Sequence, residues 1–299
     1  MPGYDLHTHT TFSDGTTTPE DNVRLALEAG LEGLGVTDHD TVASWGRARA
    51  AAHGTELEIV PGAELSAEHG GYSVHVLGYW FDPAHPQLAA EIDRLRNERE
   101  RRAEEIVLRL QELGVGVTIE RVRELAGAAP VGRPHIAAAV VEVGAAADAG
   151  EVFDRWLHDG GPAYVPKYAV SPERCVDLIV AAGGVAVLAH PALYGPSDGE
   201  GARTGVADDV IARMAARGLA GIEAAHPDHE PGEREHYLRL AADLGLVVTG
   251  GSDFHGDRKD LALGEVTTHR ERVEALRGRR PSGGSLPRPS PSTPTRHTG

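Results

Sequence analysis

The chain has 299 residues, of which 45 are acidic and 29 are Lys or Arg, so its formal net charge is −16. This acidity argues against a protein that binds long nucleic acids through its surface, because such binding depends on Lys and Arg side chains that neutralise phosphates. A single cysteine, Cys175, excludes a scaffold built on internal disulfides and favours a reducing cytoplasm. The length allows one large α/β domain or two ordinary ones.

Histidine is the unusual component of this composition. The chain contains 16 histidines, and histidine is the side chain most often used to bind metal ions and to transfer protons near neutral pH. The N-terminal sequence MPGYDLHTHT lacks the basic and apolar segments of an export signal, and no apolar stretch is long enough to cross a bilayer. We therefore expect a cytoplasmic protein that is neither exported nor inserted into a membrane.

The first third of the chain alternates strand and helix signals, which favours a parallel βα array and a barrel-like fold. The elements predicted here are, in chain order, a strand over 3–9, a helix over 19–29, a strand over 34–37, a helix over 44–53, and strands over 57–60 and 72–79.

Residues 81–161 interrupt this alternation. They begin with a long charged helix over 86–113, which contains the run RLRNERERRAEEIVLRL, and continue with shorter helical segments and no strand. We interpret them as a helical insertion domain. The arginine and glutamate side chains of the run are expected to pair along a solvated helix face rather than to bind a ligand.

Strand and helix signals alternate again after the insertion. Helices are predicted over 172–182, 206–217 and 232–244, and strands over 185–189, 221–225 and 246–249. The barrel is therefore expected to comprise residues 1–80 and 162–276. Residues 277–299 are rich in Pro, Ser, Gly and Arg, contain no acidic residue and are expected to be disordered.

Candidate metal ligands recur at or near the ends of the predicted strands. Because the carboxyl ends of barrel strands form one face, these side chains are expected to converge in space. They are His7, His9, Asp14, Asp38, His39, Glu64, His75, His190, His226, Asp253 and His255.

Each candidate taken alone also has an ordinary structural explanation. Asp38 and Asp253 suit turn or helix caps, and His190 suits a loop position before a proline. The two imidazoles of His7 and His9 would share one face of a strand, which suits two ligands to one metal. The recurrence of such residues at strand after strand favours metal binding over coincidence.

The donor atoms indicate the kind of metal. Imidazole and carboxylate without thiolate favour Mn²⁺, Zn²⁺ or Fe²⁺ over a structural cysteine–zinc site, and include more nitrogen than Mg²⁺ prefers. The candidates exceed what one ion needs, so two or three neighbouring ions are expected, with a carboxylate such as that of Glu64 bridging them.

Six motifs resemble, in chain order, those of the PHP (polymerase and histidinol phosphatase) family of metal-dependent phosphoesterases. They are DLHTHTTFSDG at 5–15, VTDHD at 36–40, PGAEL at 61–65, HVLGY at 75–79, LAHP at 188–191 and GGSDFHG at 250–256. The resemblance implies an α/β fold, a distorted TIM-like (β/α)7 barrel with a helical insertion between barrel strands. This agrees with the order of the predicted elements.

The resemblance also implies a trinuclear metal site. The first ion is expected on His7, His9, Glu64 and Asp253, the second on Asp14, His39 and His255, and the third on Glu64, His75 and His190. His226 has no ligand counterpart in the family pattern and is expected beside the ligands or facing the substrate. Three Mn²⁺ ions are expected, with Zn²⁺, Fe²⁺ or Mg²⁺ as alternatives.

Three further segments are similar to a bacterial subgroup of this family that carries a helical insertion between the fourth and fifth barrel strands. They are GRPHIAAAVVEVG at 132–144, FDRWLHDGGPAYVPKY at 153–168 and GIEAAHPDHEPGER at 221–234. The members of this subgroup act on nucleoside 3′,5′-bisphosphates and on the 5′ ends of short RNA chains.

Positive groups are needed beside the metals to orient a phosphate. Arg133 precedes Pro134, which suits the first turn of a helix, so its guanidinium is expected beside a helix N-terminus that favours anions. His135 and Lys167 are the next candidates, and Lys167 is one of only two lysines in the chain. Together with His226, these residues form the predicted catalytic and substrate-binding set.

The insertion is expected to lie over the metal face as a lid that selects what the phosphate carries. Tyr164 and Tyr168 suit either packing or stacking on a base. The expected activity is removal of the 3′-phosphate from nucleoside 3′,5′-bisphosphates, together with trimming of short single-stranded RNA from its 5′ end. Neither a long duplex nor a membrane is an expected partner.

Two alternatives remain open from the sequence. One is a phosphomonoesterase of broad specificity or with a preference for histidinol phosphate. The other is a non-catalytic PHP module that binds metal or nucleotide. The sequence also leaves the oligomeric state open.

Overall fold

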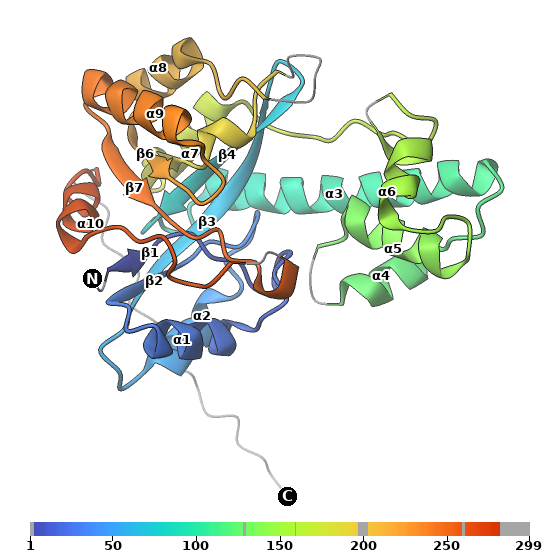
Figure 1. Ribbon diagram of the computed structural model, residues 1–299, viewed down its shortest axis with the longest axis horizontal. Helices are drawn as coiled ribbons and strands as arrows, with labels where there is room; N and C mark the ends of the chain where they lie inside the picture. Colours follow the sequence, from blue (N-terminus) through green and yellow to red (C-terminus); the bar gives the residue numbers. More distant parts are fainter. Residues whose placement is uncertain (1–2, 128–129, 159, 197–202, 259–260, 282–299) are drawn as a thin grey trace, which may run out of the picture.

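The computed structural model describes residues 3–127, 130–158, 160–196, 203–258 and 261–281. Seven strands form one sheet whose order follows the chain, and this sheet curves into a nearly closed barrel (Figure 1). The strands are β1 (Tyr4–Asp5), β2 (Gly33–Val36), β3 (Glu58–His69), β4 (Tyr72–Tyr79), β5 (Val185–Leu188), β6 (Leu219–Ala225) and β7 (Val247–Gly250).

The sheet is parallel except around β4. Strands β1, β2 and β3 pair in parallel, as do β5, β6 and β7, whereas β4 is antiparallel to both of its neighbours, β3 and β5. The predicted α/β barrel with a helical insertion between strands is confirmed. The expectation of a wholly parallel array is wrong at β4.

The antiparallel pair arises from a tight hairpin between β3 and β4. His69 pairs with Tyr72, so only Gly70 and Gly71 form the turn, and both have positive φ, 57° and 88°. Such a two-residue turn needs φ > 0 at both positions, which glycine adopts without strain. The hairpin extends β3 well beyond the predicted strand 57–60, so Glu64 lies inside the strand and not after it.

The first strand is shorter than the predicted 3–9. After β1 the backbone N–H of His7 donates to Asp5 Oδ1, and that of Thr8 donates to Thr37 Oγ1. Because side-chain oxygens replace the strand ladder here, the chain leaves the sheet early. His7 and His9 therefore follow β1 and lie at the mouth of the barrel.

Six helices pack around the barrel (Figure 1). They are α1 (Pro19–Glu28), α2 (Trp45–Ala52), α7 (Pro172–Ala181), α8 (Asp208–Ala216), α9 (Pro231–Leu244) and α10 (Arg270–Arg277). All but α10 were predicted. Apart from the strands 3–9 and 57–60, the ends of the predicted elements agree with the observed ones to within one or two residues.

The insertion lies to one side of the barrel and is reached along α3 (Pro86–Glu112) (Figure 1). Its other elements are α4 (Ile119–Ala126), α5 (Arg133–Glu142), α6 (Ala149–Val152) and a π-helical turn at Phe153–Leu157. These helices bury an apolar cluster of their own, which includes Leu110, Ile136 and Trp156. Because this cluster is separate from the barrel core, the insertion holds its shape through its own packing.

Some sequence expectations fall outside what the structure covers. Of the tail predicted to be disordered, residues 282–299 lie outside the described residues, and so does Lys259. Within the described ranges, none of the helices combines the length and the apolar character needed to cross a bilayer.

Candidate metal centre

The carboxylate of Glu64, in the middle of β3, lies at the centre of a cluster of imidazoles. Its Oε2 atom is 3.2 Å from His7 Nε2, 3.1 Å from His9 Nε2 and 3.2 Å from His39 Nδ1. The two histidines after β1 and the histidine after β2 therefore meet at one carboxylate oxygen.

The second oxygen of Glu64 contacts histidines from the other half of the barrel. Its Oε1 atom is 2.8 Å from Nδ1 of His75, in β4, and 3.0 Å from Nε2 of His190, which follows β5. Glu64 is almost completely buried. Burial raises the pKa of its carboxyl, but the surrounding His39, His7 and His75 outweigh burial and hold that pKa well below its usual range.

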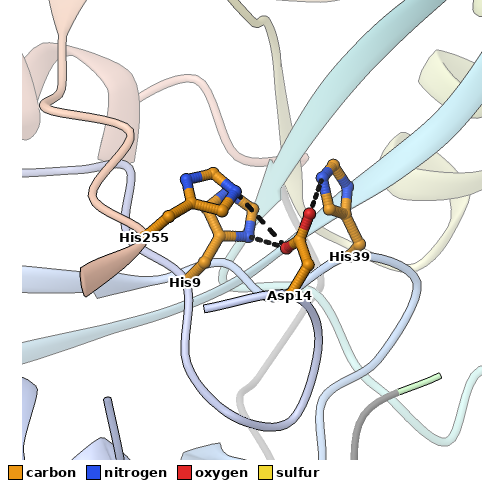
Figure 2. A group of neighbouring side chains, drawn as sticks. All are labelled: His9, Asp14, His39 and His255. Atoms are coloured by element: carbon orange, nitrogen blue, oxygen red, sulfur yellow. Dashed lines mark ion pairs between the residues drawn. The ribbon is translucent and has the colours of Figure 1, made fainter. Parts of the chain in front are cut away.

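Asp14 joins a second group of three histidines (Figure 2). Its Oδ1 atom is 3.6 Å from His9 Nδ1 and 3.3 Å from His255 Nε2, and its Oδ2 atom is 3.8 Å from His39 Nε2. The Asp14 side chain is 40% exposed, whereas that of His9 is fully buried. This group therefore forms the side of the cluster that solvent and substrate can reach.

Asp253, in the loop after β7, closes the cluster. Its Oδ1 atom is 3.1 Å from His9 Nε2, 3.3 Å from His7 Nε2 and 3.5 Å from His255 Nδ1. Both Asp253 and His190 adopt positive φ, 51° and 21°. Residues other than glycine rarely adopt such values. When they do, they are often found at functional sites, where the surrounding structure stabilises the strained backbone.

The donor atoms of the cluster fit divalent metal ions. Several are buried and have no hydrogen-bond partner, among them His7 Nε2, His9 Nε2, His39 Nδ1, Asp14 Oδ1 and Glu64 Oε2. Buried polar atoms left without partners are costly, and a cation held between imidazoles and carboxylates satisfies them. Within the described residues, three groups have ligand atoms close enough to share an ion: His9, Asp14, His39 and His255; His7, Glu64, His190 and Asp253; and His39, Glu64 and His75.

The nine predicted ligands all fall into these groups, but three are distributed differently from the prediction. His9 groups with Asp14, His190 groups with His7, and His39 also groups with Glu64 and His75. His9 still lies 3.1 Å from both Glu64 and Asp253, because it occupies the border between two groups.

Two further candidates have other roles. Asp38 belongs to none of the three groups, because its carboxylate accepts hydrogen bonds from Thr10 N, Thr10 Oγ1, Ser13 Oγ and Ser44 Oγ. It therefore holds the loop that carries Asp14. His226 is also outside the groups; its Nδ1 accepts the backbone N–H of Asp228, and its Nε2 points to Asp253 Oδ2 at 3.6 Å.

A cavity of about 250 Å³ opens beside the cluster and is lined by residues of both the barrel and the insertion. Asp14, His39 and His75 line its metal side. The three predicted substrate residues Arg133, His135 and Lys167 also line it, together with three arginines that were not predicted, Arg99, Arg102 and Arg258.

Lys167 is largely buried in this cavity and donates a hydrogen bond to Ser73 Oγ at 2.8 Å. The pKa of its ammonium is lowered to about 8, mainly by burial and also by the charges of Arg99 and Arg102, while nearby carboxylates oppose this shift. Arg99 itself pairs with the buried Asp40. Lys167 can therefore change its charge near neutral pH.

His135 presents a fixed tautomer to the cavity. Its Nδ1 accepts the backbone N–H of Gly132 at 3.1 Å, which leaves the hydrogen of the neutral ring on Nε2. Burial and then the charge of Arg258 lower its pKa, so the neutral form is favoured. Arg133 is the first residue of α5, as predicted, and donates to the carbonyl of Leu157 at 3.3 Å.

The tyrosines differ in their access to the cavity. Tyr168 lines it, donates to Glu91 Oε1 at 2.8 Å and carries the guanidinium of Arg94 over its ring at 4.0 Å. Tyr164 is not among the residues that line the cavity.

Comparisons with known proteins agree with this geometry. The model of the PHP domain matches residues 5–112. The 5′-3′ exoribonuclease Rnm of Escherichia coli is 35% identical over 263 residues, which cover 87% of this chain and 88% of the relative. The chain belongs to the PHP family of metal-dependent phosphoesterases. Like other members, it is a hydrolase that depends on divalent metal ions, so the non-catalytic alternative is set aside.

Two further PHP proteins are similar along nearly their whole length. The 3′,5′-nucleoside bisphosphate phosphatase of Chromobacterium violaceum is 34% identical over 256 residues, covering 85% of this chain and 88% of the relative. A crystal structure of a metal-dependent phosphoesterase from Bifidobacterium adolescentis superposes with a TM-score of 0.82 at 34% identity, covering 93% of this chain and 96% of that one.

The long charged helix of the insertion was only partly understood from its sequence. Arg101 pairs with Glu98 at 2.7 Å along the helix surface, as expected. Arg99 and Arg102, three residues apart on the same helix, line the cavity instead. The interpretation of the whole run as a solvated face is therefore wrong for these two arginines.

Glu223 of β6 was also missed. It is buried, and its carboxylate accepts hydrogen bonds from His7 Nδ1 and from the backbone N–H of His190. A charged residue in the middle of the apolar strand GIEAA was the available signal, because buried carboxylates need partners.

Proposed function

We propose that this PHP enzyme removes the 3′-phosphate from nucleoside 3′,5′-bisphosphates and, with the same geometry, releases nucleotides from the 5′ end of short RNA. One observation carries the proposal: a cavity lined by five cationic side chains adjoins the cluster of metal ligands. The five are Arg99, Arg102, Arg133, Lys167 and Arg258.

We infer that the nine cluster residues hold the metal ions, as the resemblance implied. Three ions, most simply Mn²⁺, agree with the three groups of donors. When bound, divalent ions activate water as a nucleophile and neutralise the phosphoryl oxygens. The ligands are His7, His9, Asp14, His39, Glu64, His75, His190, Asp253 and His255.

The number of cationic side chains in the cavity supports a binding site for a second phosphate. The phosphate that reacts lies at the metal cluster, where the ions neutralise it, so it does not need five further cations. A second phosphate, the 5′-phosphate of the substrate, accounts for the positive side chains away from the cluster. We assign Lys167 and Arg99 to this second phosphate. They lie close enough for the charge of Arg99 to lower the pKa of Lys167.

Both reactions then break the same bond. With the 5′-phosphate of the first nucleotide held by the cations, its 3′-oxygen faces the metal cluster. In a bisphosphate, water attacks the terminal 3′-phosphate and the nucleoside 3′-oxygen leaves. In RNA, the same attack on the phosphodiester releases a nucleoside 5′-monophosphate and leaves a new 5′-phosphate on the shortened chain. The cavity of about 250 Å³ suits one nucleotide at a time.

The chain supplies a hydrogen-bond donor for the leaving oxygen. His135 is neutral and carries its hydrogen on Nε2, and it lines the cavity together with Arg133. We assign to it a hydrogen bond from Nε2–H to the leaving 3′-oxygen, which takes its proton from the attacking water. We assign to His226 an electrostatic contact from Nε2 to Asp253 Oδ2, at 3.6 Å, which orients that proposed ligand.

The metal assignment predicts the behaviour of two variants. His9→Ala and Asp253→Asn should each abolish turnover and lower the Mn²⁺ bound per chain, because each removes a donor that contacts proposed ligands of two neighbouring groups. Turnover and bound Mn²⁺, measured by elemental analysis, check this. His53→Ala, at an exposed histidine outside the site, is the control and should change neither. Full activity in either ligand variant would contradict the assignment.

The substrate assignment is tested with three substrates assayed in parallel with Mn²⁺. Adenosine 3′,5′-bisphosphate and short 5′-phosphorylated RNA should each be hydrolysed with a kcat/KM about tenfold or more above that of histidinol phosphate. Of the three substrates, only these two carry a 5′-phosphate that the cationic side chains of the cavity can bind. A hydrogen bond to a charged group contributes about 1.5–3 kcal/mol. A preference for histidinol phosphate would support the monoesterase alternative.

Lys167 gives a pH test of the second phosphate. Its ammonium is charged below pH 8 and becomes neutral as the pH rises through that value. The ratio of kcat/KM for adenosine 3′,5′-bisphosphate to that for adenosine 3′-monophosphate should therefore fall by about tenfold above pH 8. Lys167→Arg should keep the ratio constant, because a guanidinium stays charged. A ratio that does not depend on pH in the wild-type enzyme would refute this role.

A further inference from the structure

Glu223 contacts two of the proposed metal ligands without belonging to any group of donors found in the described residues. Its Oε1 and Oε2 atoms lie 3.2 and 3.1 Å from His7 Nδ1, and its Oε2 atom accepts the backbone N–H of His190 at 2.9 Å. One buried side chain of β6 thus reaches residues that follow β1 and β5.

The first contact fixes the tautomer of His7. A carboxylate can only accept, so the hydrogen of the neutral ring must lie on Nδ1. The lone pair of Nε2 then faces Glu64 and Asp253, at 3.2 and 3.3 Å. The other tautomer would place a hydrogen where His7 must donate electrons to a metal.

The second contact fixes the backbone of His190. This residue has φ 21° and ψ 61°, a conformation that residues other than glycine rarely adopt. The hydrogen bond from its N–H to Glu223 stabilises this conformation, in which His190 Nε2 lies 3.0 Å from Glu64 Oε1.

Gly251 leaves the space that Glu223 needs. A Cβ atom at this position would lie 2.4 Å from His7 Cβ and 2.8 Å from Glu223 Oε1, closer than real atoms approach. Any side chain at position 251 would therefore separate the carboxylate from the imidazole. The close packing of these three residues shows that the contact is built into the barrel.

We propose that Glu223 is a positioning residue that sets the ring tautomer of His7 and the backbone of His190, and thereby raises the affinity of the site for divalent metal. This inference rests on the proposed role of both histidines as ligands. A carboxylate behind a metal-binding histidine also makes the imidazole a stronger donor.

The test measures Mn²⁺ binding to the full chain without substrate, by electron paramagnetic resonance of free Mn²⁺ and by the Mn²⁺-dependent rise in Tm. Glu223→Gln should remain folded and bind at least one Mn²⁺ with a Kd about 10–100-fold higher than that of the wild type. Glu223→Ala should weaken binding at least as much. Excess Mn²⁺ should restore the turnover of Glu223→Gln while its KM for substrate stays unchanged.

Ile222→Val is the matched control, because it shortens a neighbouring buried side chain of β6 that packs in the apolar core. It should lower Tm without changing the Kd for Mn²⁺. An unchanged Kd in Glu223→Gln, or an equal rise in Ile222→Val, would overturn the proposal. The result does not depend on the nucleotide assignment, since no substrate is present, and His9→Ala tests the ligand assignment separately.

A measurement on the wild-type chain covers the case in which the variants do not fold. Nitrogen chemical shifts of the His7 ring in Zn²⁺-loaded protein should show the hydrogen on Nδ1. A hydrogen on Nε2 would overturn the proposal.

Discussion

The structure of this protein depends on a carboxylate that is buried among histidines. Glu64 is almost inaccessible to solvent, yet its two oxygens lie within 3.2 Å of five imidazoles. A buried charge without partners is very costly, so the carboxylate requires positive or electron-accepting partners around it. The loops after β1, β2 and β5 and the strand β4 bring those partners, and the proposed metal ions would satisfy the remaining donor atoms.

The departure from a regular barrel makes this arrangement possible. Because β3 and β4 form an antiparallel hairpin, Glu64 and His75 extend from neighbouring strands toward the same centre. The insertion adds cations to the cavity through α3 and the start of α5, and the barrel adds Lys167 and Arg258. The barrel thus supplies the proposed ligands, and the insertion supplies most of the groups proposed to select the substrate.

Much of the metal cluster could be predicted from the sequence, because ligands at strand ends must converge on one face of a barrel. His7, His190 and Asp253 needed no knowledge of side-chain packing. Two things could not be predicted in this way. Which side of α3 faces the cavity, and with it Arg99, depends on how the helices of the insertion pack. Which way the Glu223 side chain points depends on how β6 pairs with its neighbouring strands. The hairpin between β3 and β4 was also missed, although two adjacent glycines were an available signal for it.

We propose that both oxygens of Glu64 would hold metal ions at the mouth of the barrel. Anomalous diffraction at the manganese absorption edge, from crystals grown with Mn²⁺, tests it most directly. Such crystals should show at least two anomalous peaks, each about 2.0–2.6 Å from an oxygen of Glu64. A single peak that does not touch Glu64, or no peak at the cluster, would contradict it.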